Sequence, residues 1–202
     1  MNILKSEFHK LKHTWIPWAH FILPVLYALI FYGAATFTSL KNFSYMDIVL
    51  NYFVLLGAIL PIIFGAITSK VVDMEASAGR FQVILSTTKS RSKAYGGKLI
   101  MLLLSFLFSI SLAVFIFAML FGNQRTMAWL IELLLVFIGC LSTYMIHLWV
   151  SIMLGGGASI GLGFVETLLA LLSITNLGEN IWYFLPCTWA SRLSATYIVG
   201  KL

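Results

Sequence analysis

Five long apolar runs constrain this chain more than any other feature of its sequence. A helix needs about 20 apolar residues to cross the roughly 30 Å hydrocarbon core of a bilayer. The chain is 60% hydrophobic and 10% charged, whereas soluble domains are about half apolar and about a quarter charged. One core built from 202 residues could not bury that much apolar surface. We therefore predict an all-α integral membrane protein and exclude a soluble enzyme, a secreted disulfide scaffold and a disordered tail.

The predicted membrane spans belong to one transmembrane domain that covers residues 1–202. They lie at residues 16–38, 48–69, 99–121, 127–154 and 157–176. Pro24 lies inside the first span and Pro61 inside the second. Pro17 also belongs to the first span. A proline within a helix removes a backbone hydrogen bond, so the first span is predicted to be kinked.

The first fifteen residues, 1–15, predict a helix that lies in the headgroup layer in front of the first span. Apolar side chains recur there at helical spacing, and basic side chains fill the other faces toward anionic lipid. The apolar positions are Leu4, Phe8, Leu11 and Trp15, and the basic positions are Lys5, Lys10, Lys12 and His13. The apolar run that follows is too long for a cleaved signal peptide.

The distribution of basic residues predicts the orientation of the chain. Nine Lys and Arg residues lie in the N-terminal segment and in the connection 70–98, and four lie in the opposite loops and the C-terminal segment. Because cytoplasmic loops carry the excess of basic residues, the N-terminus and this connection are predicted to be cytoplasmic. In a membrane protein the net charge of +6 reflects these loops, and we expect no nucleic-acid partner.

No catalytic motif or metal site is recognisable in the sequence. Gly97-Lys98 is followed by Leu99 where a phosphate-binding loop needs Ser or Thr, so the chain is expected to bind no ATP by that device. His9 and His13 are four residues apart, but no Glu lies between them as a zinc-protease motif requires. The sequence predicts neither an enzyme nor a bound cofactor, and its two cysteines, Cys140 and Cys187, are predicted to be free thiols.

Three ionisable residues lie inside predicted spans, where a charge at mid-helix costs about 2.5–3.5 kcal/mol. Glu132 lies one turn inside the outer end of its span and is expected to reach water. His147 shares a helical face with Thr143 and Ser151, which favours a hydrogen-bonded packing role over a proton relay. Glu166 lies at mid-span, is expected to face the bundle or a partner, and is the stronger candidate for a role in transport.

Glycines cluster around the start of the last span. The triplet 155–157 predicts a tight turn between the fourth and fifth spans. Gly161 and Gly163 predict a face where another helix approaches closely, since small residues allow such packing in membranes.

The connection 70–98 is too charged to span the membrane and too long for a simple turn. Within it Phe81, Ile84 and Leu85 follow helical spacing and predict a short helix with an apolar ridge. Two interpretations stay open: this helix lies on the membrane surface, or it docks in a groove of a soluble partner.

The same connection, placed between the second and third spans behind an amphipathic N-terminal helix, resembles the permeases of ABC-2 type transporters. The matching positions are Glu75, Gly79, Phe81, Leu85, Arg91 and Lys98. The C-terminal third resembles lantibiotic immunity permeases more closely, through a glycine-rich turn and a tryptophan–proline segment. Those positions are Asn176, Leu177, Gly178, Ile181, Trp182, Phe184, Pro186, Trp189 and Arg192.

The resemblance covers nearly the whole chain and implies a function. The chain would be the permease subunit of an exporter in the bacterial cell membrane that expels a lantibiotic peptide and protects the cell that makes it. Its partners would be a cytosolic ATPase dimer that binds ATP and Mg²⁺, a second permease subunit, the peptide and membrane lipid. The implied ATPase-coupling residues are Glu75, Gly79, Arg80, Phe81, Ile84, Leu85, Arg91 and Lys98. The implied peptide-facing residues, in an outer amphipathic segment over 177–202, are Glu179, Trp182, Phe184, Pro186, Trp189 and Arg192.

One feature departs from that family, which has a sixth span after the position of Arg192. Only SATYIVGKL follows here, which is too short to cross a bilayer. Either a sixth span lies beyond Leu202 or the subunit lacks one, and an odd number of spans leaves the C-terminus outside.

Three other functions remain open. A permease for another lipid-like or drug substrate would share the connection 70–98 but would not need the tryptophan segment. A scaffold subunit without transport activity would need neither. A membrane enzyme would need paired Glu and His side chains at one depth, and we expect Glu132, His147 and Glu166 to lie at three different depths.

Overall fold

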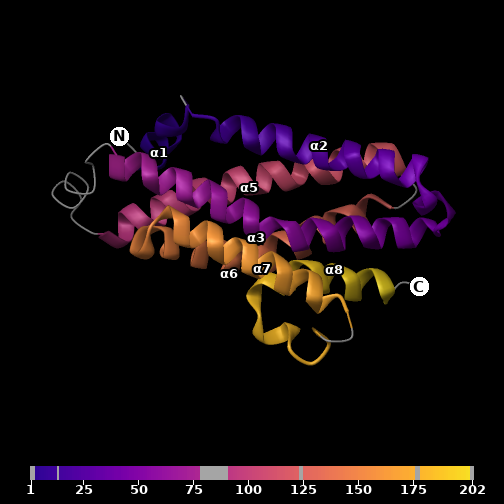
Figure 1. The fold of residues 1–202 in the computed structure, drawn as a ribbon. Coiled ribbons are helices and arrows are strands. Elements are labelled where there is room, and N and C mark those ends of the chain that lie inside the picture. Colours follow the sequence, from indigo (N-terminus) through magenta and orange to yellow (C-terminus); the bar gives the residue numbers. More distant parts are fainter. Residues whose placement is uncertain (1–2, 13, 78–90, 123–124, 176–177, 201–202) are drawn as a thin grey trace.

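The computed structural model is a bundle of long helices, and it describes residues 3–12, 14–77, 91–122, 125–175 and 178–200. Figure 1 shows the helices running roughly along one axis, with the N-terminus at one end of the bundle and the C-terminus near the other. No strand occurs in these described ranges. The predicted all-α fold is therefore confirmed.

Within these ranges, five helices are long and apolar enough to cross a membrane: α2 (Ile16–Phe37), α3 (Tyr45–Ser77), α5 (Arg91–Phe121), α6 (Thr126–Leu154) and α7 (Gly156–Ser173). Their number agrees with the prediction, and the bounds of α2, α6 and α7 agree to within three residues. By contrast, α3 extends eight residues beyond the predicted end, and α5 begins eight residues before its predicted start. Much of the expected connection 70–98 is thus helical extension of α3 and α5, and the expected ridge of Phe81, Ile84 and Leu85 lies outside the described residues.

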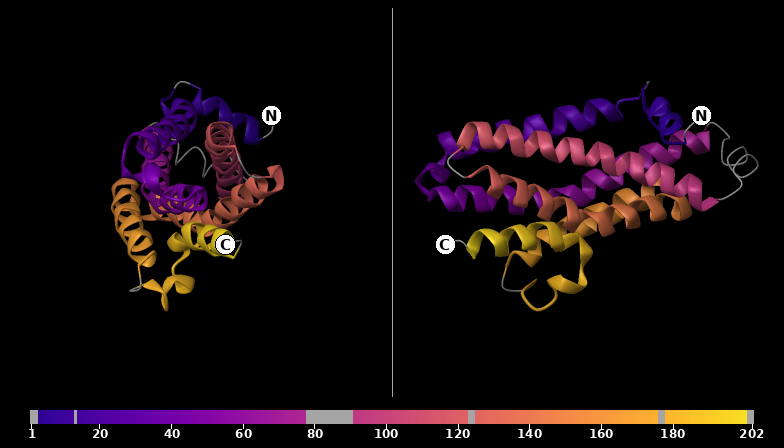
Figure 2. Two further views of the ribbon diagram at one scale, coloured as in Figure 1. Left: turned by 90° about the vertical axis from the view of Figure 1, so that its right-hand side faces the viewer. Right: turned by 180° about the vertical axis from the view of Figure 1, so that it is seen from behind.

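Five shorter elements complete the part of the chain that the structure describes. The N-terminal helix α1 (Ile3–Leu11) lies against the beginning of α5, and the 3-10 turn η1 (Ser39–Asn42) joins α2 to α3. The 3-10 turns η3 (Trp182–Phe184) and η4 (Pro186–Thr188) precede α8 (Trp189–Val199). Figure 2 shows the segment between α7 and α8 projecting from the side of the bundle.

An aromatic cluster holds α2, α3 and α5 together toward the end opposite α1. The rings of Tyr52 and Phe117 stack with centroids 3.7 Å apart, and Phe31 meets both rings edge-on. The hydroxyl of Tyr52 donates to the Ala113 carbonyl at 2.9 Å, and that of Tyr27 donates to the Tyr52 carbonyl at 2.6 Å. Aromatic burial and satisfied hydroxyls together stabilise the contact between these three helices.

Small residues let α7 pack directly against the backbone of α3. A Cβ atom at Gly65 would lie 2.6 Å from the Ser159 carbonyl oxygen, and one at Gly163 would lie 2.7 Å from the Pro61 carbonyl oxygen. The predicted packing role of Gly163 is therefore confirmed. That of Gly161 is wrong, because a Cβ there would meet nothing within 4 Å. The predicted turn is present at Gly155, whose φ of +90° is one that favours glycine.

Replacing Gly65 with alanine is expected to destabilise the bundle by about 1–3 kcal/mol, because the added methyl group forces two helix backbones apart. The same change at Gly161 should be neutral or slightly stabilising, since alanine is the better helix former by roughly 0.8–1.0 kcal/mol. Thermal unfolding of both variants in one detergent compares them directly. Equal melting temperatures would show that α3 and α7 do not pack as described.

The last helix, α8, packs inside the bundle on α3 and α6. Two more glycines permit this: a Cβ at Gly57 would lie 2.5 Å from the Ser191 nitrogen, and one at Gly139 would lie 2.7 Å from the Ala190 Cα. With 11 residues, α8 is too short to cross a bilayer. It starts midway along the bundle and runs toward the end opposite α1 (Figures 1 and 2).

Candidate functional site

Four charged side chains meet at the end of the bundle that holds α1. Lys98 of α5 pairs with Glu75 of α3 at 2.8 Å and with Glu7 of α1 at 3.0 Å. Lys10 of α1 pairs with Glu75 at 2.9 Å and also with Glu7, one helical turn before it. We call these four residues the charge cluster. It ties α1 to the extended ends of α3 and α5.

The charge cluster is balanced and largely shielded from water. The side chains of Lys98, Glu75 and Glu7 are 7%, 8% and 10% exposed. Burial alone would lower the pKa of the Lys10 ammonium, but the carboxylates of Glu7 and Glu75 outweigh that effect and hold its pKa above the ordinary value of 10.5. A raised lysine pKa keeps its stabilising contribution until the pH rises above that value. Lys10 therefore stays charged at neutral pH.

The charge cluster includes two of the residues that we expect to couple to an ATPase. Glu75 and Lys98 lie where α3 and α5 lead into residues 78–90, but their charges are already paired within the chain. They are placed to fix the base of that segment rather than to present free charges. Arg91 begins α5, and Gly79, Arg80, Phe81, Ile84 and Leu85 lie outside the described residues.

A second polar group lies in the middle of the bundle, between α3, α6 and α7. His147 Nε2 lies 2.9 Å from Glu166 Oε2, and His147 Nδ1 lies 2.8 Å from Ser159 Oγ. Ser159 Oγ is 3.1 Å from Thr68 Oγ1, to which Ser151 donates at 3.0 Å. With Nε2–H donating to the carboxylate, Nδ1 is free to accept from Ser159. Each of the five side chains in this network thus has a hydrogen-bond partner in a region where water is scarce.

The expectation that Glu132, His147 and Glu166 lie at three depths is wrong for the last two, which form a direct pair. His147 lies on α6 and Glu166 on α7, and these two helices are joined by the turn at Gly155 and pack against each other. The expected packing role of His147 agrees with its hydrogen bonds. Glu166 faces the bundle, as expected. The described residues hold no group of three His, Cys, Asp or Glu that could bind a metal ion.

The expected access of Glu132 to water is also wrong. This residue is 1% exposed and lies on the face of α6 that is turned into the bundle. A carboxylate there is shielded by neighbouring helices instead of emerging at the end of its span.

The segment between α7 and α8 presents aromatic side chains to its surroundings. Ile181, Tyr183 and Phe184 are 53%, 50% and 74% exposed, and Glu179 beside them is exposed. Trp189 Nε1 donates to the Tyr183 carbonyl at 3.1 Å, and the Thr188 hydroxyl donates to the Trp182 carbonyl at 2.6 Å. The exposed aromatic residues are therefore held on a loop that its own hydrogen bonds fix.

Pro186 and Arg192 frame the return of this loop into the bundle. Pro186 begins the turn η4 and separates it from η3, so the segment forms two short pieces, as its position between the tryptophans predicts. Arg192 lies half-buried in α8, where its Nε and Nη2 atoms have no hydrogen-bond partner among the described residues.

Sequence reasoning missed several members of these groups. Glu7 is the one acidic residue in a basic segment, and that isolation is a signal for an ion pair. Lys10 was assigned to lipid because its helix face is basic. Thr68 and Ser159 carry no signal in the sequence, since hydroxyl residues are common in membrane helices and bond to their own backbone.

Long apolar helices with polar side chains gathered between them define a multi-pass membrane protein. Residues 3–169 match the family described as ABC-2 family transporter protein, so the chain belongs to the ABC-2 transporter family. Searches of curated proteins and of solved structures returned no match.

Membership of this family defines the general role of the chain. It is the membrane-spanning component of a transporter, a kind of subunit that is generally not catalytic itself. Such components typically work with a separate ATPase subunit. The resemblance found in the connection 70–98 is thereby confirmed at the level of the family.

Proposed function

We propose that this chain is the permease subunit of an exporter that expels a lantibiotic, or a similar antimicrobial peptide, from the bacterial membrane. The observation that supports this substrate class is the exposed aromatic loop between α7 and α8. Phe184, Tyr183 and Ile181 form an apolar surface beside the carboxylate of Glu179. Lantibiotics are cationic and amphipathic, and an aromatic surface at the membrane interface suits such a ligand.

In this proposal the end of the bundle with α1 is cytoplasmic. The excess of basic residues in the N-terminal segment and around residues 78–90 supports that orientation. The exposed aromatic loop then lies toward the outer leaflet, and the peptide leaves on that side. A dimeric ATPase and a second permease subunit complete the transporter, and ATP and Mg²⁺ bind to the ATPase.

The charge cluster supports a route for coupling in this proposal. An ATPase that grips residues 78–90 pulls on α3 and α5 together, because Lys98 and Glu75 join the ends of those helices. Glu7 and Lys10 extend the connection to α1. The cytoplasmic end therefore moves as one body, and the motion passes along the long helices to the opposite end.

Replacing Phe81 with aspartate is expected to abolish co-purification with the ATPase while membrane insertion stays normal. Burying such a side chain stabilises a contact by roughly 1.5–3 kcal/mol, so its loss weakens association by about tenfold to a hundredfold. The matched control is Phe43→Asp, which places the same charge on an aromatic side chain that is 50% exposed at the other end of the bundle. Full co-purification of the Phe81 variant would overturn this coupling assignment.

The substrate class is tested by removing the exposed aromatic surface. Tyr183→Ser combined with Phe184→Ser should reduce the tolerance of living cells to a lantibiotic by tenfold or more, while expression and ATPase association are kept. These residues are better targets than Trp182 and Trp189, whose backbone and side chain hold the loop together. The control is Phe164→Ser on α7, which is 56% exposed on the side of a spanning helix. Unchanged tolerance at equal expression would reduce the loop to a membrane anchor.

A second candidate is export of a small lipid-like or drug substrate. A cavity of about 280 Å³ lies between α2, α3 and α5, and its lining is almost wholly apolar, with Leu23, Tyr27 and Ile59 among its walls. That volume is near the lower end of the roughly 300–1,000 Å³ of typical ligand sites. It suits a small apolar molecule and is too small for a folded peptide. This candidate predicts that the loop variant keeps its lantibiotic tolerance. It also predicts that changes in the cavity lining alter the tolerance of cells to a drug.

A further inference from the structure

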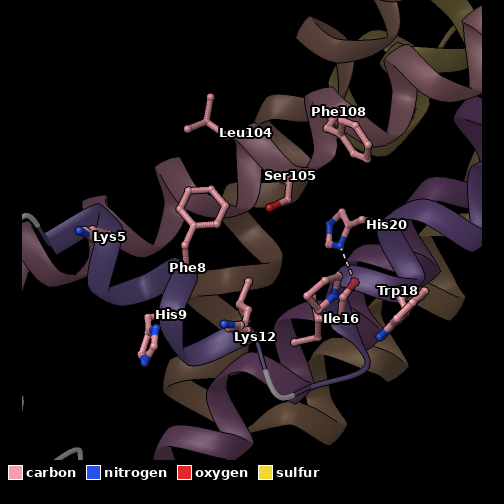
Figure 3. A pocket seen from close by; sticks show the side chains of 12 residues that line it. Lys5, Phe8, His9, Lys12, Ile16, Trp18, His20, Leu104, Ser105 and Phe108 are labelled. Atoms are coloured by element: carbon pink, nitrogen blue, oxygen red, sulfur yellow. Dashed lines mark hydrogen bonds between the residues drawn. The ribbon is translucent and has the colours of Figure 1, made fainter.

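A groove of about 1140 Å³ lies between α1 and the first turns of α2, with α5 as its far wall. It is open along one side, toward the surroundings of the bundle (Figure 3). Apart from its charged rim and the side chains of Ser105 and His20 it is apolar, and it lies at the end of the bundle that holds α1. The groove is separate from the charge cluster, which occupies the opposite face of α1.

One face of α1 supplies the rim of the groove. Lys5, Phe8 and Lys12 are spaced three and four residues apart, so they lie above one another on the same side of the helix. All three are exposed, and all three line the groove. Glu7 lies on the other side of the helix and is 8% exposed, whereas Leu11, 5% exposed, also lines the groove. Lys5 and Lys12 therefore lie on either side of Phe8 along one face of α1.

The walls come from α2 and α5. Trp18 of α2 and Leu104 and Phe108 of α5 are 67%, 45% and 55% exposed. Figure 3 shows Phe8 and Lys12 reaching from α1 toward the space that these side chains enclose. Exposed aromatic rings at such a level are typical of the interface between headgroups and hydrocarbon.

The floor of the groove holds one polar side chain that lacks a partner. His20 is 6% exposed, and its Nδ1 lies 2.9 Å from the Ile16 carbonyl oxygen, to which it donates. Its Nε2 is buried and has no hydrogen-bond partner among the described residues. Figure 3 shows the ring turned into the groove. A buried ring nitrogen left in this way points to a polar group of a bound molecule.

The chemistry of the lining selects one class of ligand. The described residues that line the groove include Lys5, Lys12 and His9 at the rim and no acidic side chain. A soluble anion would use the rim but leave the apolar walls uncovered. A neutral lipid would cover the walls but leave the two ammonium groups unpaired. A molecule with a phosphate at one end and a hydrocarbon chain at the other satisfies both.

We propose that this groove binds one anionic glycerophospholipid, with its phosphate between Lys5 and Lys12 and an acyl chain along Phe8, Leu104 and Phe108. The glycerol region then lies over His20, and the lipid fills the space between α1 and the bundle. This site is independent of the peptide and of the ATPase. A bound lipid explains why α1 lies beside the bundle with the side chain of Phe8 turned toward the open side of the groove.

Native mass spectrometry of the purified full chain tests the proposal. The probe is an equimolar mixture of phosphatidylglycerol and phosphatidylcholine with identical acyl chains, added to the chain in detergent. The unaltered chain should retain one phosphatidylglycerol in preference to phosphatidylcholine. Lys5→Gln combined with Lys12→Gln should weaken that retention by about 30-fold, which corresponds to two basic residues near an anionic lipid. Both side chains are exposed, so the variant should fold normally.

The matched control is Lys41→Gln combined with Arg125→Gln, which removes the same charge from exposed positions at the other end of the bundle. This variant should retain phosphatidylglycerol as the unaltered chain does. Equal loss in both variants would mean a general charge effect and would overturn the site. Equal retention of the two lipids by the unaltered chain would overturn it as well. Displacement of the lipid by soluble glycerol phosphate would show that the rim binds a free anion and would overturn the lipid assignment.

Discussion

Replacing Lys98 with methionine is expected to lower the stability of the folded chain by about 3–5 kcal/mol, because it breaks a buried ion pair and leaves one partner uncompensated. The change leaves the carboxylates of Glu7 and Glu75 with Lys10 as their remaining partner in the charge cluster. For a chain of this length that loss corresponds to a melting temperature lower by roughly 10 °C. Thermal unfolding in detergent, followed by size-exclusion chromatography, measures it.

Two further variants test whether charge balance explains this loss of stability. Lys70→Met makes the same substitution at an exposed lysine of α3 near the same end, and it should change stability by less than about 0.5 kcal/mol. Adding Glu7→Gln to Lys98→Met restores one carboxylate for one ammonium and should recover much of the loss. If the double variant melts no higher than Lys98→Met alone, lost packing of the lysine stem explains the effect and the electrostatic explanation fails.

Replacing His147 with leucine is expected to lower the free energy of unfolding by about 3 kcal/mol. Most of this loss arises because the Glu166 carboxylate loses its partner. A hydrogen bond between membrane helices contributes only about 0.6 kcal/mol on average, so loss of the contacts to Glu166 and Ser159 is a small effect by itself. A carboxylate left without a partner at mid-span is the larger cost, roughly 2.5–3.5 kcal/mol. The melting temperature should fall accordingly.

Variants of Glu166 separate a packing role from a proton relay. His147→Leu with Glu166→Leu removes both polar groups and should melt well above His147→Leu alone. Glu166→Gln keeps a hydrogen-bond acceptor for His147 and should preserve both the fold and transport, measured as cell survival in lantibiotic. A well-folded Glu166→Gln variant without transport would contradict the packing role and favour movement of a proton between the two side chains.

The sequence predicts the membrane helices more accurately than the polar sites. Long apolar runs predicted the five membrane helices because crossing a bilayer fixes the length and hydrophobicity of a segment. The predicted ends of α3 and α5 are wrong because charged residues do not end these helices, which continue where their charges are paired. Glu75 and Lys98 form such a pair.

The polar sites and the close helix contacts depend on which helices become neighbours, and no local sequence pattern predicts that. The glycines are the simplest example. Gly161 and Gly163 lie two residues apart and look equivalent in the sequence, but only Gly163 faces α3. Helical periodicity predicts which residues share a face, and it does not predict which neighbour that face meets.

By itself, then, the sequence predicts that the chain crosses a membrane, which apolar segments do so and which family of transporter it resembles. Those properties follow from composition, segment length and short motifs, all of which are local. Only the tertiary structure decided that Glu7 and Lys10 join Glu75 and Lys98, and that His147 meets Glu166. These pairings join residues of different helices, so they depend on how the helices are tilted and rotated against one another. That arrangement is set by packing over the whole bundle, which is why no segment of the sequence contains it.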